Sequence, residues 1–125
     1  MNMDKQTIKA KWLEELRFGG HEQVPGTLKA DKPEGTIGYC CLGVLEEKVL
    51  GNQITAVQLL DPSGVGLVMD YEGPTSTYER IKEDVIGNRS LFYELIQMND
   101  NGWTFPKIAD YIEHNWNPDP EETVE

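Results

Sequence analysis

The chain has 125 residues and a formal net charge of −11, and 38% of its residues are hydrophobic. This length predicts one domain with a single core. So negative a surface repels phosphate backbones and lipid headgroups, so neither direct nucleic-acid binding nor membrane association is expected. No secretory leader and no run of roughly 18 apolar residues is visible, which favours a cytoplasmic protein.

The first predicted element is an amphipathic helix that Asp4 caps and that Gly19-Gly20 ends. Its apolar positions follow the three-four spacing of one buried stripe: Ile8, Trp12, Leu13 and Leu16. Residues 21–37 contain two prolines and two glycines. They predict a long connection with at most a short extended piece near Val24–Leu28.

A second helix is predicted over residues 39–50, where Gly43 would let another backbone come close and residues 46–48 would face water. Next come two segments rich in β-branched residues, Ile54–Leu60 and Val65–Tyr71. The turn signal Asp-Pro-Ser-Gly lies between them, so the pair predicts a β-hairpin.

The rest of the chain predicts three helices. One runs to Val85 from a cap at Ser76 or Thr77, one covers residues 90–98, and one is capped by Thr104. Residues 97–102 predict an inter-helix turn rather than a calcium loop, because Ile108 stands where the loop requires a bidentate Glu.

These elements predict a single α+β domain over residues 1–117, with helices packed on a small antiparallel sheet that contains the hairpin. Residues 118–125 predict an acidic flexible tail. The free edges of so small a sheet favour a homodimer. The predicted core consists of Trp12, Leu16, Cys41, Val44, Leu45, Leu59, Val68, Leu95, Ile108 and Ile112.

The adjacent thiols of Cys40 and Cys41 lie in an uncharged apolar run and are interpreted as buried structural groups. Their spacing matches no zinc site, and the acidic chain offers little to stabilise a thiolate. We therefore expect no catalytic residue, no metal and no cofactor. A Cys/His enzyme using His21 or His114 is kept as an alternative.

Polar aromatic and cationic residues at the ends of elements are the candidate ligand-binding groups, because a nucleotide needs positive charge for phosphate and aromatic faces for its base. These residues are Arg17, His21, Tyr39, Tyr71, Arg80, Arg89 and Trp103.

Three segments together resemble a family of small phage and prophage accessory proteins. They are Trp12-Leu13-Glu14-Glu15-Leu16-Arg17-Phe18-Gly19-Gly20, then Tyr39-Cys40-Cys41-Leu42-Gly43-Val44-Leu45, then Met98-Asn99-Asp100 followed by Phe105-Pro106-Lys107-Ile108-Ala109-Asp110-Tyr111-Ile112-Glu113. Glu46 stands where many members have a third Cys, and Phe18 where a Ser is usual.

The resemblance implies a non-enzymatic phage protein in the cytoplasm of an infected bacterium. By analogy with other small acidic accessory proteins, it would counter a host defence. Two modes stay open: sequestration of a small nucleotide signal, or blockade of a host immune protein. A third possibility is an acidic DNA mimic that inhibits a host nucleic-acid-binding protein.

Overall fold

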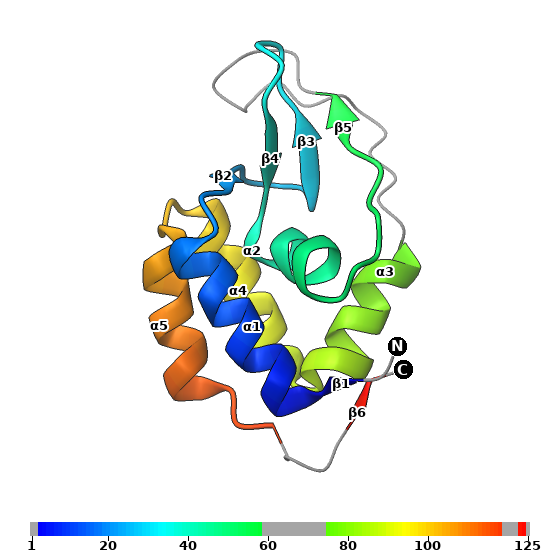
Figure 1. Ribbon diagram of the computed structural model, residues 1–125, viewed down its shortest axis with the longest axis vertical. Coiled ribbons are helices and arrows are strands. Elements are labelled where there is room, and N and C mark those ends of the chain that lie inside the picture. Colours follow the sequence, from blue (N-terminus) through cyan, green and yellow to red (C-terminus); the bar gives the residue numbers. More distant parts are fainter. Residues whose placement is uncertain (1–2, 59–74, 119–122, 125) are drawn as a thin grey trace.

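The computed structural model describes residues 3–58, 75–118 and 123–124 (Figure 1). Its helices pack on one side of a small four-stranded sheet, as the predicted α+β class requires. In the part of the chain described, no helix is long and apolar enough to cross a membrane.

Helix α1 (Lys5–Phe18) begins where the sequence predicts, because the Asp4 carboxylate accepts a hydrogen bond from the Thr7 N–H at 2.8 Å. Of the predicted apolar stripe, Ile8, Trp12 and Leu16 are buried, whereas Leu13 is only partly buried against the core. Helix α5 (Phe105–Asn115) is likewise capped by Thr104, as predicted.

The sheet has the strand order β2 (Glu22–Gln23), β4 (Ile37–Tyr39), β3 (Lys29–Asp31), β5 (Val57–Gln58). Only β3 and β4 pair antiparallel, whereas β2 pairs parallel with β4 and β5 parallel with β3. The sheet is therefore mixed and not purely antiparallel as expected.

The antiparallel hairpin lies in the segment for which a long connection was predicted. Strands β3 and β4 are joined by a turn in which the Lys32 N–H donates to the Thr36 carbonyl at 2.9 Å. Each strand has three residues, and β3 contains one apolar side chain, Ala30. A strand of three residues is too short to show the alternation of apolar and polar residues by which strands are predicted. The hairpin predicted over 54–71 lies mostly outside the described residues, including its core positions Leu59 and Val68.

The predicted second helix comprises α2 (Cys41–Gly43), which continues directly into the π-helical turn η1 (Val44–Val49). It lies centrally beneath the sheet (Figure 1). Gly43 makes the close approach expected of it, because a Cβ there would overlap the carbonyl oxygen of Leu28. The prediction that residues 46–48 face water is wrong at Glu46, which is only 3% exposed.

Helix α3 (Thr75–Arg80) continues into η2 (Ile81–Ile86), which ends at Gly87 with φ 67°. It begins at Thr75, before either of the predicted caps Ser76 and Thr77, and ends one residue after the predicted end at Val85. Helix α4 (Arg89–Asp100) is capped by Asn88 and extends two residues beyond the predicted end at Met98.

The helices share one core, in which the two buried tryptophans cross edge to face with ring centroids 5.8 Å apart. The Trp12 indole N–H donates to the Cys41 carbonyl at 3.0 Å, and that of Trp116 donates to Ile86 at 3.1 Å. All predicted core residues that the structure describes are buried. Beyond the core, β1 (Met3–Asp4) pairs antiparallel with β6 (Thr123–Val124), so two residues of the expected tail form a strand.

Candidate functional site

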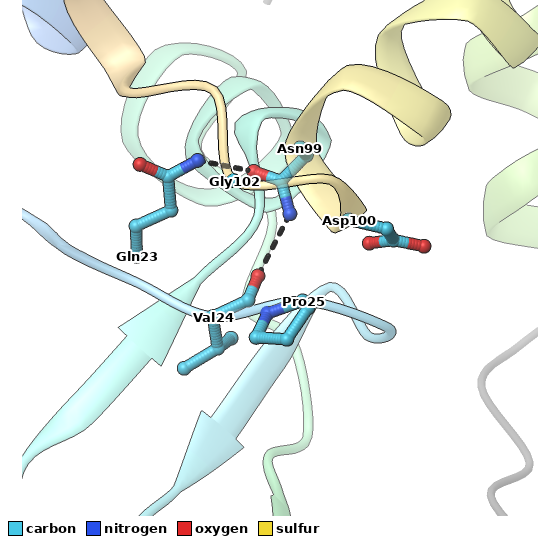
Figure 2. A pocket seen from close by; sticks show the side chains of 6 residues that line it. All are labelled: Gln23, Val24, Pro25, Asn99, Asp100 and Gly102. Carbon is cyan, nitrogen blue, oxygen red and sulfur yellow. Dashed lines mark hydrogen bonds between the residues drawn. The ribbon is translucent and has the colours of Figure 1, made fainter. Parts of the chain in front are cut away.

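Three hollows follow one another where residues 20–27 pass the turn between α4 and α5. The first has a volume of about 260 Å³ (Figure 2). Its walls are Gln23, Val24, Pro25, Asn99, Asp100 and Gly102.

The buried Asn99 side chain holds this first hollow together. Its Oδ1 accepts from the Gln23 side-chain amide at 2.9 Å and from the Cys41 N–H at 3.2 Å. Its Nδ2 donates to the Val24 carbonyl at 2.8 Å. One amide therefore ties residues 23–24 and the start of α2 to the end of α4, through three of the four hydrogen bonds that it can make.

Asp100 adds a carboxylate to the rim. Its Oδ1 accepts from the Gly26 N–H at 2.8 Å, which fixes residues 24–27 against the end of α4. No cationic side chain lines this hollow.

The second hollow, of about 50 Å³, shares Asn99 and Asp100 with the first. Its other walls are Gly26, Thr27, Cys40, Tyr78 and Ile96. Thr27 is 3% exposed, and its hydroxyl has no hydrogen-bond partner among the described residues. Such a group costs stability unless something occupies the space beside it.

The third hollow, of about 250 Å³, lies on the other side of Gln23 and contains two of the predicted site residues, Arg17 and His21. Arg17 donates to Asp110 at 2.7 Å and to Glu113 at 2.6 Å across the α1–α5 interface. These hydrogen bonds, that to Glu113 first, raise the pKa of Arg17 above its ordinary value, and Arg17 in turn lowers the pKa of Glu113.

Two more of the predicted residues lie close to His21 and Gln23. The Tyr39 ring meets the His21 ring edge to face with centroids 5.9 Å apart. The Trp103 carbonyl accepts from Gln23 at 2.7 Å, while its ring lies under the Lys107 ammonium, 4.5 Å from the ring centroid.

Tyr39 is buried and belongs to a separate polar cluster with Glu47. Its hydroxyl donates to the Glu47 carboxylate at 2.6 Å, and burial followed by this interaction raises the pKa of Tyr39 to about 12. Burial by itself would raise the pKa of Glu47, but hydrogen bonds from Lys29, Tyr39 and the Ile54 N–H lower it below the ordinary value. The cluster joins β4, β3 and η1.

Two other predicted site residues, Arg89 and Arg80, line none of these three hollows. Arg89 lies at the exposed start of α4 and reaches Glu83 at 3.3 Å. Arg80 pairs with the buried Glu46 of η1. Tyr71 lies outside the described residues.

We expect Arg80→Met to lower the free energy of unfolding by about 2 kcal/mol, because it leaves the buried Glu46 carboxylate without its counter-charge. The Arg80 side chain is about a third exposed, which moderates the loss. Urea unfolding measures the change. The matched double variant Arg80→Met with Glu46→Gln should recover most of it, and a double variant as unstable as the single one would contradict this account.

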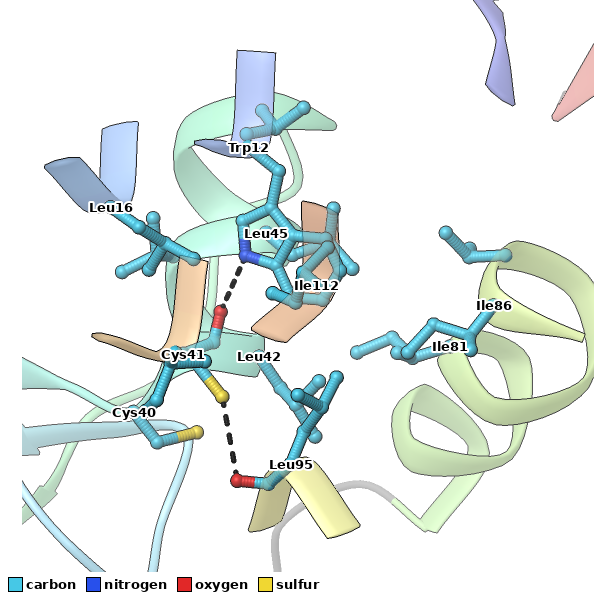
Figure 3. Packing of buried hydrophobic residues seen from close by; sticks show 14 of the residues in the cluster. Trp12, Leu16, Cys40, Cys41, Leu42, Leu45, Ile81, Ile86, Leu95 and Ile112 are labelled. Atoms are coloured by element: carbon cyan, nitrogen blue, oxygen red, sulfur yellow. Dashed lines mark hydrogen bonds between the residues drawn. The ribbon is translucent and has the colours of Figure 1, made fainter. Parts of the chain in front are cut away.

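The cysteines are buried, as predicted (Figure 3). Burial raises the pKa of Cys40 to about 11 and that of Cys41 well above its ordinary value. The Cys41 thiol donates to the Leu95 carbonyl at 3.8 Å. The imidazoles are engaged elsewhere: His21 pairs with Glu15 at 2.6 Å, and His114 bonds to the Asp110 carbonyl. Among the residues described, no three His, Cys, Asp or Glu side chains gather as a metal site.

We expect both thiols to resist an aromatic disulfide reagent at pH 8 in the native protein, because each is neutral and shielded there. In guanidinium chloride both should react. Absorbance of the released thiolate follows the reaction, and stoichiometric labelling of the folded protein would revive the Cys/His enzyme hypothesis.

The sequence did not reveal the groups that build the first two hollows: Gln23, Thr27, Asn99 and Asp100. One signal was available. Leu91, Leu95 and Asn99 are spaced four residues apart, which places a polar side chain on the apolar stripe of a helix.

No family model matches this chain, and neither a curated protein nor a solved structure matches it.

Proposed function

We propose that this protein is a phage accessory protein that acts in the host cytoplasm by binding and blocking a host defence protein, with no catalysis of its own. The phage origin rests on the family resemblance of its sequence. The choice of blockade over sequestration of a nucleotide signal rests on the charges and hollows of the fold.

One observation carries that choice: each of the three arginines of the chain already donates to a carboxylate. Arg17 is held by two acidic residues of α5, and Arg80 by a buried glutamate. A phosphate would have to compete with these carboxylates for its cation. The arginines also lie on different elements and do not converge on one hollow.

The size of the hollows supports the same choice. Pockets for drug-sized ligands have volumes of about 300–1,000 Å³. Two of the hollows described above measure about 260 and 250 Å³, and Asp100 stands on the rim of the first. A nucleotide would meet too little space there and a repelling charge.

The surface offers an anchor for a protein partner. Phe18, at the end of α1, is 80% exposed, and it directly follows Arg17, which lines the third hollow. Exposed aromatic residues are common anchors of interfaces. The exposed carboxylates of Asp110 and Glu113 lie beside Arg17, so a partner with a basic rim around an apolar pocket fits this face.

A pair of serine variants tests the proposal. Phe18→Ser should abolish co-purification of the host protein from infected cells, while Tyr93→Ser, which removes a ring 49% exposed on α4, should leave it unchanged. Phe18→Ser should unfold at the wild-type urea concentration, since its ring is exposed, whereas Tyr93→Ser should unfold slightly earlier, because the Tyr93 ring packs against Phe92 and its hydroxyl accepts from Lys82. Equal capture by all three proteins would contradict the assigned face.

Native mass spectrometry of the same material separates the other modes. A retained nucleotide would overturn the proposal in favour of sequestration. Competition of the captured protein by duplex DNA would instead indicate a DNA mimic. The same spectra give the oligomeric state, for which we propose pairing through the β2 edge of the sheet.

A further inference from the structure

We infer that the first and second hollows form one site for a primary ammonium group, with Asp100 as its counter-ion and the Thr27 hydroxyl as its second acceptor. The group would belong either to a free polyamine or to a lysine side chain of a bound protein. The lysine source rests on the proposed function, and the polyamine source does not.

The electrostatics of the hollows select a cation. Asp100 lies at the C-terminal end of the 12-residue helix α4, where the helix dipole places partial negative charge. One of its oxygens is bound to the Gly26 N–H. None of the residues that line either hollow is Lys, Arg or His, so the carboxylate has no counter-charge in its own walls.

A second, independent observation lies inside the smaller hollow. Thr27 lines it, is 3% exposed, and has an unpartnered Oγ1. A cavity needs about 10–15 Å³ to accept one water molecule, and this one measures about 50 Å³. The smaller hollow is therefore large enough for a small polar head group that donates a hydrogen bond to the Thr27 hydroxyl. Tyr78 lines the same hollow with an aromatic ring, and the face of an aromatic ring attracts cations.

The same features favour ammonium over other cations. Hard metal ions require six or more oxygen ligands, and this site offers a single carboxylate. A guanidinium group is wide and planar, whereas an ammonium group is compact and carries three donors on a flexible stem. The larger hollow borders the smaller one at Asn99 and Asp100, and the proposed site places the stem there.

The test is a ¹H–¹⁵N titration of the full-length protein with three probes: spermidine, Nα-acetyl-lysine methylamide and the uncharged Nα-acetyl-norleucine methylamide. The two ammonium probes should shift the amide signals of Gly26, Thr27, Cys40 and Asp100 in a saturable manner. The norleucine probe should not. Tenfold tighter binding of spermidine identifies a polyamine site, and equal or tighter binding of the lysine probe identifies a side-chain site.

Matched variants locate the contacts. Asp100→Asn keeps an oxygen that accepts from the Gly26 N–H but loses the negative charge. The variant should bind both ammonium probes about tenfold more weakly. Thr27→Val removes the unpartnered hydroxyl at nearly constant volume. This variant should bind both ammonium probes about fivefold more weakly, while the protein stays at least as stable as wild type. Asp84→Asn, on the exposed side of η2, is the control that should bind as wild type does.

Absence of shifts, or shifts spread over the acidic surface and equal in Asp100→Asn and Asp84→Asn, would overturn the site and leave Thr27 solvated by water only. Phe18→Ser should bind the probes unchanged. Loss of the host protein in that variant, with probe binding intact, would separate this inference from the proposed function.

Discussion

Gly43→Ala should lower the free energy of unfolding by at least about 3 kcal/mol, because the added methyl group has no room. An ideal Cβ would stand 2.8 Å from the Leu28 carbonyl carbon and overlap its oxygen. That oxygen also accepts from the Cys40 N–H at 3.2 Å, and Leu28 is fully buried. Neither backbone can retreat without breaking the contact between the central helix and the sheet. Urea unfolding monitored by tryptophan fluorescence measures the loss.

Gly87→Ala is the matched control for this result. Gly87 has φ 67°, and a Cβ there would meet only the Lys5 ammonium at 3.6 Å and the Glu83 carbonyl oxygen at 3.9 Å. Gly87→Ala should therefore lower the free energy of unfolding only by the cost of placing alanine in the left-handed backbone region, about 1 kcal/mol. A loss in Gly43→Ala no larger than that in Gly87→Ala would show that the close approach to Leu28 does not make glycine necessary at position 43, because helix propensity by itself favours alanine there.

Asn99→Leu should cost about 3 kcal/mol, although it keeps the size of a side chain on the buried stripe of α4. The substitution leaves the Cys41 N–H and the Val24 carbonyl buried without partners, and each such group costs about 1–3 kcal/mol. The Gln23 amide keeps its bond to the Trp103 carbonyl. Chemical denaturation measures the total, and faster hydrogen exchange at the Cys41 amide identifies its origin.

Asn115→Leu provides the comparison, because Asn115 is exposed and its amide donates only to Tyr111 within α5. We expect a change within about 0.5 kcal/mol. If Asn99→Leu were equally mild, the three hydrogen bonds of Asn99 would contribute nothing that packing does not replace, and the first hollow would lose its structural basis.

The helices were predictable because the residues that define each of them lie close together in the sequence. Asp4 and Thr104 cap the helices predicted for them, and Trp12 lies on a stripe with the helical period. The close approach at Gly43 was also predictable, since a glycine inside an apolar helix has few other reasons to be there.

The sheet and the hollows were not predictable, because their causes are non-local. Strand β3 has three residues and depends on β4 and β5 for its existence. The buried Glu46 has its counter-charge in Arg80, 34 positions further along the chain. Thr27 is enclosed by side chains from three other parts of the chain. These partners are so far apart in the sequence that no local stretch contains both members of a pair.

The pairing of β1 with β6 has a practical consequence for every binding measurement. It brings the first and last strands together at the end of the molecule opposite β2 and the α4–α5 turn (Figure 1). An affinity tag or a surface linkage attached next to either strand is therefore placed at the end opposite β2 and the α4–α5 turn. The same proximity should allow a circular permutant, in which a short linker joins the two strands and new ends open elsewhere, to retain the fold.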